Sequence, residues 1–171
     1  NLVLLLDVSG SMTGNAEVTQ QAVAVIVSNL RQGDTFSLVT YSSEDRVVLD
    51  GFSVSSAQDK EILMGMLLTL EIDGGTWGSA GIETAYRLGA EHYQDNCNNQ
   101  VILITDGDLN FGITKKDGLR QLIEEKKKSN LFLSVIGTGL WNYKGDKLET
   151  LSKHGNGTYC VVNSLDDVEE S

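Results

Sequence analysis

The sequence contains no proline, only two cysteines and no apolar run long enough to cross a membrane. A membrane-spanning helix needs about 18 consecutive apolar residues. Cys97 and Cys160 lie far apart and no C-x-x-C pair exists, which excludes a disulfide framework. We therefore expect two unpaired thiols, and they leave the redox compartment open. A basic segment followed by an apolar one, typical of a signal peptide, is also missing from the start.

Basic residues are scarce. The chain has 13 Lys and Arg against 24 Asp and Glu, for a net charge of −11. This balance argues against nucleic acid and anionic membranes as partners and favours cations or basic partners. A length of 171 residues is enough for one domain with a full core. Because the chain opens inside an expected strand at Asn1 and stops on an acidic tail at Ser171, we expect one domain, residues 1–171, excised from a longer protein.

Strand-like and helix-like patterns alternate along the chain. We expect strands over residues 2–6, 36–41, 47–49, 101–104, 131–136 and 158–162. Residues 42–45 form too short a connection for a crossover, so the second and third strands should be antiparallel. This order predicts an α/β fold: a doubly wound, mostly parallel six-stranded sheet with helices on both faces and one short antiparallel edge strand.

Apolar residues at helical spacing predict which helix faces are buried. Ser55 or Ser56 can cap the second helix, and a final helix can begin at Ser164. The expected buried faces are Val18, Ala22, Val25, Ile26 and Leu30 in the first helix; Ile62, Met66 and Leu70 in the second; Ile82, Ala85, Tyr86 and Gly89 in the third; Leu119, Leu122 and Ile123 in the fourth; and Leu148 and Leu151 in the fifth.

The first strand runs directly into Asp7-Val8-Ser9-Gly10-Ser11. A carboxylate and two hydroxyls thus follow an uninterrupted apolar strand, and Gly10 allows a sharp turn between the serines. Hard oxygen ligands of this kind suit Mg²⁺ or Mn²⁺ rather than Zn²⁺. The alternative interpretation is a strand end followed by a serine-capped helix.

Other segments also carry side chains with oxygen atoms that could bind the same metal ion. Asp106 comes after the apolar run 101–104, and Thr76 closes the Gly74-Gly75-Thr76 loop before a helix. Right-handed crossovers place the carboxyl ends of parallel strands on one edge of the sheet, where ligands bind. Two carboxylates and three hydroxyls would form an incomplete octahedral site with an open position. Such a site favours an incoming carboxylate, which a partner protein could supply.

Three motifs together resemble the metal-ion-dependent adhesion site of von Willebrand factor type A domains, especially those of the bacterial branch. They are D-V-S-G-S at 7–11, the threonine of G-G-T-W-G-S-A-G at 74–81, and T-D-G-D at 105–108. The resemblance covers nearly the whole chain. It implies direct metal contacts from Ser9, Ser11 and Thr76, and contacts from Asp7 and Asp106 that are direct or made through water. It also implies Mg²⁺ as the ion, with Mn²⁺ or Ca²⁺ as alternatives, and a partner Glu or Asp.

The same resemblance suggests a bacterial cell-envelope or secreted protein, with a cytoplasmic role as the alternative. Trp77 departs from the small or polar residues common after that threonine. We hypothesise that Trp77 and Trp141 flank the metal as partner contacts, although such aromatics can instead pack onto their loops. Asp108 either holds a metal-bound water or is a solvated turn residue, and for Asp73 we favour the solvated role.

An enzyme is the main alternative. A haloacid-dehalogenase-type phosphatase also places an aspartate after its first strand, but its general acid two residues later is here Ser9. No G-x-S-x-G, P-loop or G-x-G-x-x-G motif occurs where such chemistry needs it. Neither His92 nor His154 is placed as a base. We therefore expect a binding module rather than an enzyme; a structural domain with a vestigial metal site stays open as well.

Overall fold

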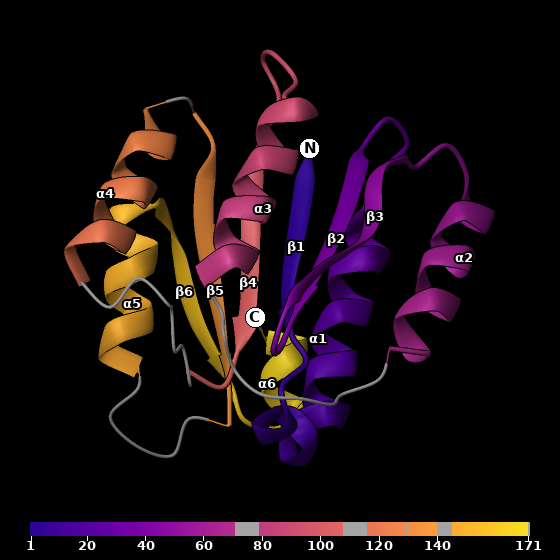
Figure 1. The fold of residues 1–171 in the computed structure, drawn as a ribbon. Helices are drawn as coiled ribbons and strands as arrows, with labels where there is room; N and C mark the ends of the chain where they lie inside the picture. Colours follow the sequence, from indigo (N-terminus) through magenta and orange to yellow (C-terminus); the bar gives the residue numbers. More distant parts are fainter. Residues whose placement is uncertain (71–78, 108–115, 129, 140–144, 171) are drawn as a thin grey trace.

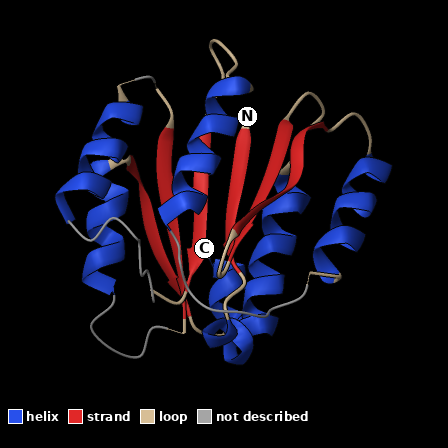
Figure 2. Ribbon diagram, in the orientation of Figure 1, coloured by secondary structure: helices blue, strands red, loops and turns tan. Residues whose placement is uncertain are grey.

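A computed structural model of the chain describes residues 1–70, 79–107, 116–128, 130–139 and 145–170. Strands and helices alternate along it (Figure 1). Figure 2 shows the strands as one central layer with helices around it. The elements are β1 (Leu2–Asp7), the 3-10 helix η1 (Gly10–Asn15), α1 (Ala16–Asn29), β2 (Thr35–Tyr41), β3 (Asp45–Ser53), α2 (Ala57–Leu68), α3 (Ser79–Glu91), β4 (Gln100–Thr105), α4 (Lys116–Lys127), β5 (Phe132–Thr138), α5 (Gly145–His154), β6 (Asn156–Val162) and α6 (Leu165–Glu170).

The six strands form one sheet in the order β3-β2-β1-β4-β5-β6. All neighbouring pairs are parallel except β2 and β3, which are antiparallel. The predicted fold class is therefore confirmed. The strand order reverses beside β1, where β2 lies on one side and β4 on the other. In Figure 1 the parallel strands end at the lower edge of the sheet, so the ends of β1 and β4 lie side by side at this switch point.

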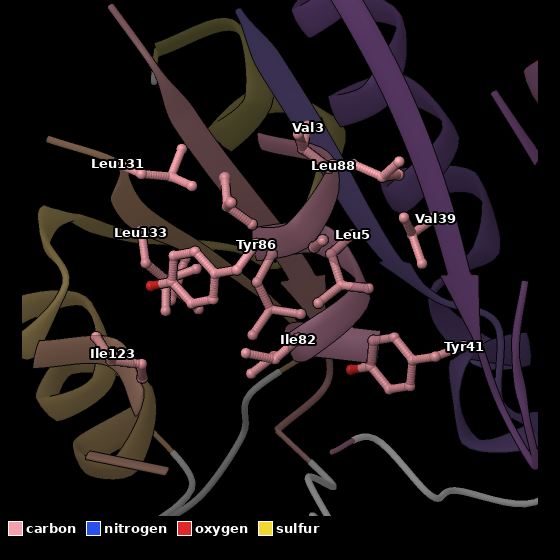
Figure 3. Packing of buried hydrophobic residues seen from close by; sticks show 14 of the residues in the cluster. Val3, Leu5, Val39, Tyr41, Ile82, Tyr86, Leu88, Ile123, Leu131 and Leu133 are labelled. Atoms are coloured by element: carbon pink, nitrogen blue, oxygen red, sulfur yellow. The ribbon is translucent and has the colours of Figure 1, made fainter. Parts of the chain in front are cut away.

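Each face of the sheet has its own hydrophobic core. Val3 and Leu5 of β1 pack on the face covered by α3, α4 and α5, whereas Leu4 and Leu6 pack on the face covered by α1, α2 and α6. Figure 3 shows the first of these cores, with side chains from β1, β2 and α3 packed together. Because β1 is buried on both faces, its sequence is apolar without alternation.

The buried face of α3 and the helix caps agree with the sequence analysis. Ile82, Ala85 and Tyr86 are fully buried. Ser56 begins α2 in a capping box with Asp59, and Ser164 precedes α6. Ile123 and Leu148 are buried as expected, and both cysteines are free.

The predicted buried faces of the first two helices are wrong in part. In α2 the buried residues are Leu63 and Leu67, while Ile62 is 47% exposed. In α1 the deepest residues include Val23 and Val27, whereas Val25 and Ile26 are only half-buried. Both helices carry runs of consecutive apolar residues, over 62–64 and 22–27. Apolar residues all around a helix leave periodicity unable to choose one face.

The antiparallel edge strand is longer than predicted. Instead of residues 47–49, β3 spans Asp45–Ser53, and its pairing with β2 contains register shifts. Because the strand has a neighbour on only one side, exposed polar residues such as Asp50 and Ser53 can belong to it. None of the described helices is both long and apolar enough to cross a bilayer.

Candidate metal centre

Asp7, the last residue of β1, has a fully buried side chain held by three hydrogen bonds. Its Oδ1 accepts from the backbone N–H of Ser9 at 3.0 Å. Its Oδ2 accepts from the Tyr41 hydroxyl at 3.1 Å and from the Thr105 hydroxyl at 2.9 Å. Tyr41 is the register partner of Asp7 on β2, and Thr105 ends the neighbouring strand β4. The two strands that flank β1 thus position this carboxylate from both sides.

Burial raises the pKa of Asp7 above its ordinary value. The hydrogen bonds from Ser9 and Thr105 oppose that shift, and the negative charge of Asp106 adds to it. Burial, together with the charge of Asp7, also raises the pKa of Tyr41 well above its usual range, so its hydroxyl stays protonated as a donor. Two carboxylates therefore repel one another here, and a divalent cation would relieve that repulsion.

Ser9 and Ser11 place their hydroxyls side by side. The two Oγ atoms share a hydrogen bond of 3.0 Å, with Ser9 buried and Ser11 exposed. Mg²⁺ binds oxygens at about 2.0–2.1 Å in octahedral geometry, which puts adjacent ligand oxygens about 3 Å apart. The observed spacing thus fits two neighbouring ligands of one Mg²⁺.

The capping role considered for this loop is not what the structure shows. Ser9 is the N-cap residue that precedes η1, but its side chain makes no capping hydrogen bond there. The turn is closed by the backbone instead, with Met12 N donating to Ser9 O at 2.9 Å. Gly10, expected to allow the turn between the serines, begins η1 without a positive φ, whereas Gly107 and Gly139, which follow β4 and β5 at this edge, have φ values of 85° and 65°.

Asp106 follows β4 directly and is buried, with 8% of its surface exposed. It comes close enough to Asp7 for the two charges to interact. The chain then turns at Gly107, whose N–H donates to the Thr105 hydroxyl at 3.1 Å. The structure therefore brings together four of the predicted metal-site residues: Asp7, Ser9, Ser11 and Asp106.

The other predicted residues lie outside the described part of the chain. These are Thr76 as a ligand, Asp108 and Asp73 as possible supporting residues, and Trp77 and Trp141 as possible partner contacts. Their roles stay predictions. Among the described residues, no group of three or more His, Cys, Asp or Glu side chains is arranged to hold a metal. A metal centre here would therefore depend on its hydroxyl ligands.

The two histidines pair with carboxylates elsewhere. His92 Nε2 lies 2.6 Å from Asp50 of β3, and His154 Nδ1 lies 3.0 Å from Glu124 of α4. Neither contacts the oxygens around Asp7.

Sequence reasoning missed Tyr41 and Thr105 as supporting residues. Each ends a strand next to β1, so the strand order would have indicated them once β1 was placed between β2 and β4.

Comparison with known proteins identifies the family. A sequence model described as the von Willebrand factor type A domain matches residues 1–171. The chain belongs to this family. Such domains are known for metal-dependent adhesion and interaction, and the bacterial relatives found support the bacterial branch.

One relative is the uncharacterized protein YfbK of Escherichia coli, which is 31% identical over 172 residues. The match covers 99% of this chain but 29% of YfbK, so the chain spans less than a third of that relative.

Two solved structures share the fold of this type A domain. The von Willebrand factor type A protein from Catenulispora acidiphila has a TM-score of 0.81 at 20% identity, and the match covers 99% of this chain and 40% of that one. Proximal thread matrix protein 1 from the mussel byssus has a TM-score of 0.75 at 21% identity, covering 99% and 42%. The latter structure is described as having a zinc-occupied metal-ion-dependent adhesion site.

Proposed function

We propose that this type A domain binds a divalent cation and, through it, a carboxylate of a partner protein. The proposed ligands are Asp7, Ser9, Ser11, Thr76 and Asp106, with Mg²⁺ as the expected ion and Mn²⁺ or Ca²⁺ as alternatives. When bound, the cation supplies positive charge and an open position for a Glu or Asp side chain. The 3.0 Å separation of the Ser9 and Ser11 hydroxyls is the observation that carries this proposal.

Asp7 and Asp106 have different proposed roles from the serines. Oδ2 of Asp7 already accepts two hydrogen bonds, whereas Oδ1 accepts one from a described residue. This supports a contact of Asp7 with the cation through water, with the two serine hydroxyls binding directly. Asp106 adds the second negative charge next to the cation.

The proposed partner contacts around the metal are Trp77 and Trp141, and Asp108 is proposed to hold a metal-bound water. For the protein that contains this domain we propose a bacterial cell-envelope or secreted location. We also propose that residues 1–171 form a single domain of a longer chain, in line with the small share of YfbK that they match.

We infer a binding module and not an enzyme. The described residues around Asp7 are hydroxyls, a phenol and a second carboxylate, with no histidine among them. Ser9 occupies the position where a haloacid-dehalogenase-type phosphatase needs a general acid, and a hydroxyl is a poor proton donor at neutral pH.

An NMR titration tests the proposal. Mg²⁺ should shift the backbone amides of residues 9–12, and the peptide Ac-Gly-Glu-Gly-NH₂ should shift them further only when Mg²⁺ is present. The matched peptide Ac-Gly-Gln-Gly-NH₂, which lacks the charge, should have no effect. Equal responses to both peptides would contradict carboxylate binding, and hydrolysis of p-nitrophenyl phosphate that depends on Asp106 would instead support an enzyme.

A further inference from the structure

A hollow of about 720 Å³ opens beside the candidate metal centre. Val8 lines it and stands between Asp7 and Ser9 in the sequence, so the hollow begins at the loop that carries the proposed ligands. Its walls come from the ends of β2 and α2 and from the start of β3. The described lining residues that matter for recognition are Val8, Thr40, Arg46, Val48, Met66 and Leu70.

Arg46 faces this hollow. It is the register partner of Thr40, and paired residues on antiparallel strands share one face of the sheet. The preceding residue, Asp45, also lines the hollow, and its Oδ2 accepts a 2.6 Å hydrogen bond from the Thr84 hydroxyl of α3. Arg46 is exposed and forms no ion pair with another described residue.

Arg46 brings a positive charge to the hollow. Arg46 is the only basic residue among the described residues that line it, in a chain of net charge −11. A guanidinium group binds a carboxylate through two parallel hydrogen bonds, which a lysine cannot reproduce. Glu44 and Asp45 also line the hollow and carry the opposite charge, but the carboxylate of Asp45 accepts a hydrogen bond from Thr84. Glu44 would disfavour an incoming acid, so Arg46 and Glu44 should affect the binding of an acidic peptide in opposite directions.

We propose that Arg46 binds a second carboxylate of the partner. This inference rests on the proposed function, because the first carboxylate would be the one that reaches the metal. The recognised segment then carries two acidic side chains separated by an apolar residue that packs against Val48, Met66 and Leu70.

The sheet geometry sets the spacing of the two acids. Thr40 pairs with Leu6 on one side and with Arg46 on the other. Neighbouring strands lie about 4.8 Å apart, so the Cα atom of Arg46 is about 10 Å from that of Leu6. Leu6 directly precedes Asp7, so this distance approximates the separation of Arg46 from the proposed metal site. An extended peptide rises about 3.3 Å per residue, which places the two acids about two to four residues apart.

Defined peptides test this inference. The probes are Ac-Asp-Leu-(Gly)n-Asp-NH₂ with zero, one or two glycines, together with the versions in which either Asp is replaced by Asn. Affinities are measured by NMR titration at saturating Mg²⁺. At one spacing the two-acid peptide should bind about tenfold more tightly than either one-acid peptide, a gain of about 1.4 kcal/mol.

Matched variants assign the gain to Arg46. Arg46→Gln should reduce the affinity of the two-acid peptide to that of a one-acid peptide. Arg46→Lys should retain only part of the gain in affinity. Arg31→Gln removes the same charge at the other end of the sheet, between α1 and β2, and should leave the gain unchanged. Glu44→Gln should leave it unchanged or increase it.

The outcomes separate this inference from the proposed function. A wild-type domain whose residues 9–12 do not respond to Mg²⁺ would overturn both. If Mg²⁺ and a one-acid peptide bind but the second acid adds nothing, the role of Arg46 is wrong and the metal site stands. Equal losses in Arg46→Gln and Arg31→Gln would also overturn it, because the effect would then be general electrostatics.

Discussion

The hydroxyl of Tyr41 donates a 3.1 Å hydrogen bond to Oδ2 of Asp7 across the β1–β2 pair, and both side chains are buried. Tyr41→Phe removes this donor and leaves the carboxylate with one partner fewer. Because a buried hydrogen bond to a charged group contributes about 1.5–3 kcal/mol, we expect the free energy of unfolding to fall by about that amount. Urea denaturation in metal-free buffer measures the change.

Tyr86 provides the matched control for this prediction. Its hydroxyl is buried without a hydrogen-bond partner in the described structure, and its ring packs in the same core (Figure 3). Tyr86→Phe should therefore leave stability unchanged or raise it, since no bond is lost. Equal losses in the two variants would show that the Tyr41 hydroxyl has no special role at Asp7.

The capping box of α2 predicts a dependence on pH. Hydrogen bonds from Ser55 N–H, and then from Ser56, lower the pKa of Asp59 below its ordinary value. The pKa of Asp59 is lower in the folded state than in the unfolded state. Asp59 therefore stabilises the fold at pH values above its unfolded-state pKa, which is about 3.9. This contribution is lost as the pH falls through the lower folded pKa. The Tm difference between the wild type and Asp59→Asn should therefore be largest near neutral pH and shrink in acid, and a constant difference would contradict the assignment.

Two glycines should respond in opposite ways to alanine. A Cβ at Gly157 of β6 would lie 2.0 Å from the backbone oxygen of Leu133 in β5, so the strands would have to separate. Gly157→Ala should lower the free energy of unfolding by about 1–3 kcal/mol or prevent folding. A Cβ at Gly65, inside α2, would meet nothing within 4 Å, so Gly65→Ala should stabilise by about 0.5–1 kcal/mol. Urea denaturation of both variants checks the pair, and a stable Gly157→Ala protein would contradict the close approach.

The fold could be predicted because β1, β4 and β5 are short apolar strands and α3 has a clear helical period. The buried faces of α1 and α2 could not, since six consecutive apolar residues at 22–27 and similar runs in α2 allow several orientations. Only packing against the sheet and the neighbouring helix selects Leu63 and Val27 for burial. The full extent of β3 was missed for a related reason, because an edge strand tolerates polar residues.

The candidate site was predictable in its charged and hydroxyl residues, because Asp7, Ser9, Ser11 and Asp106 all follow apolar strands directly. The residues that hold Asp7 in place through hydrogen bonds could not be predicted. Tyr41 and Thr105 become neighbours of Asp7 only through the order β2-β1-β4, which sequence spacing does not fix. The direction in which Arg46 points likewise depends on its register with Thr40.

One cation held between the ends of β1 and β4 is the central proposal, and calorimetric titration with Mg²⁺ tests it most directly. We predict saturable binding to the wild type, accompanied by a rise in Tm, since a ligand at 100 times its Kd stabilises by about 2.7 kcal/mol. Asp106→Ala should abolish both effects, whereas Asp95→Ala, which removes an exposed carboxylate between α3 and β4, should retain them. Mg²⁺ binding of equal strength in the wild type and Asp106→Ala, or none in the wild type, would contradict the account.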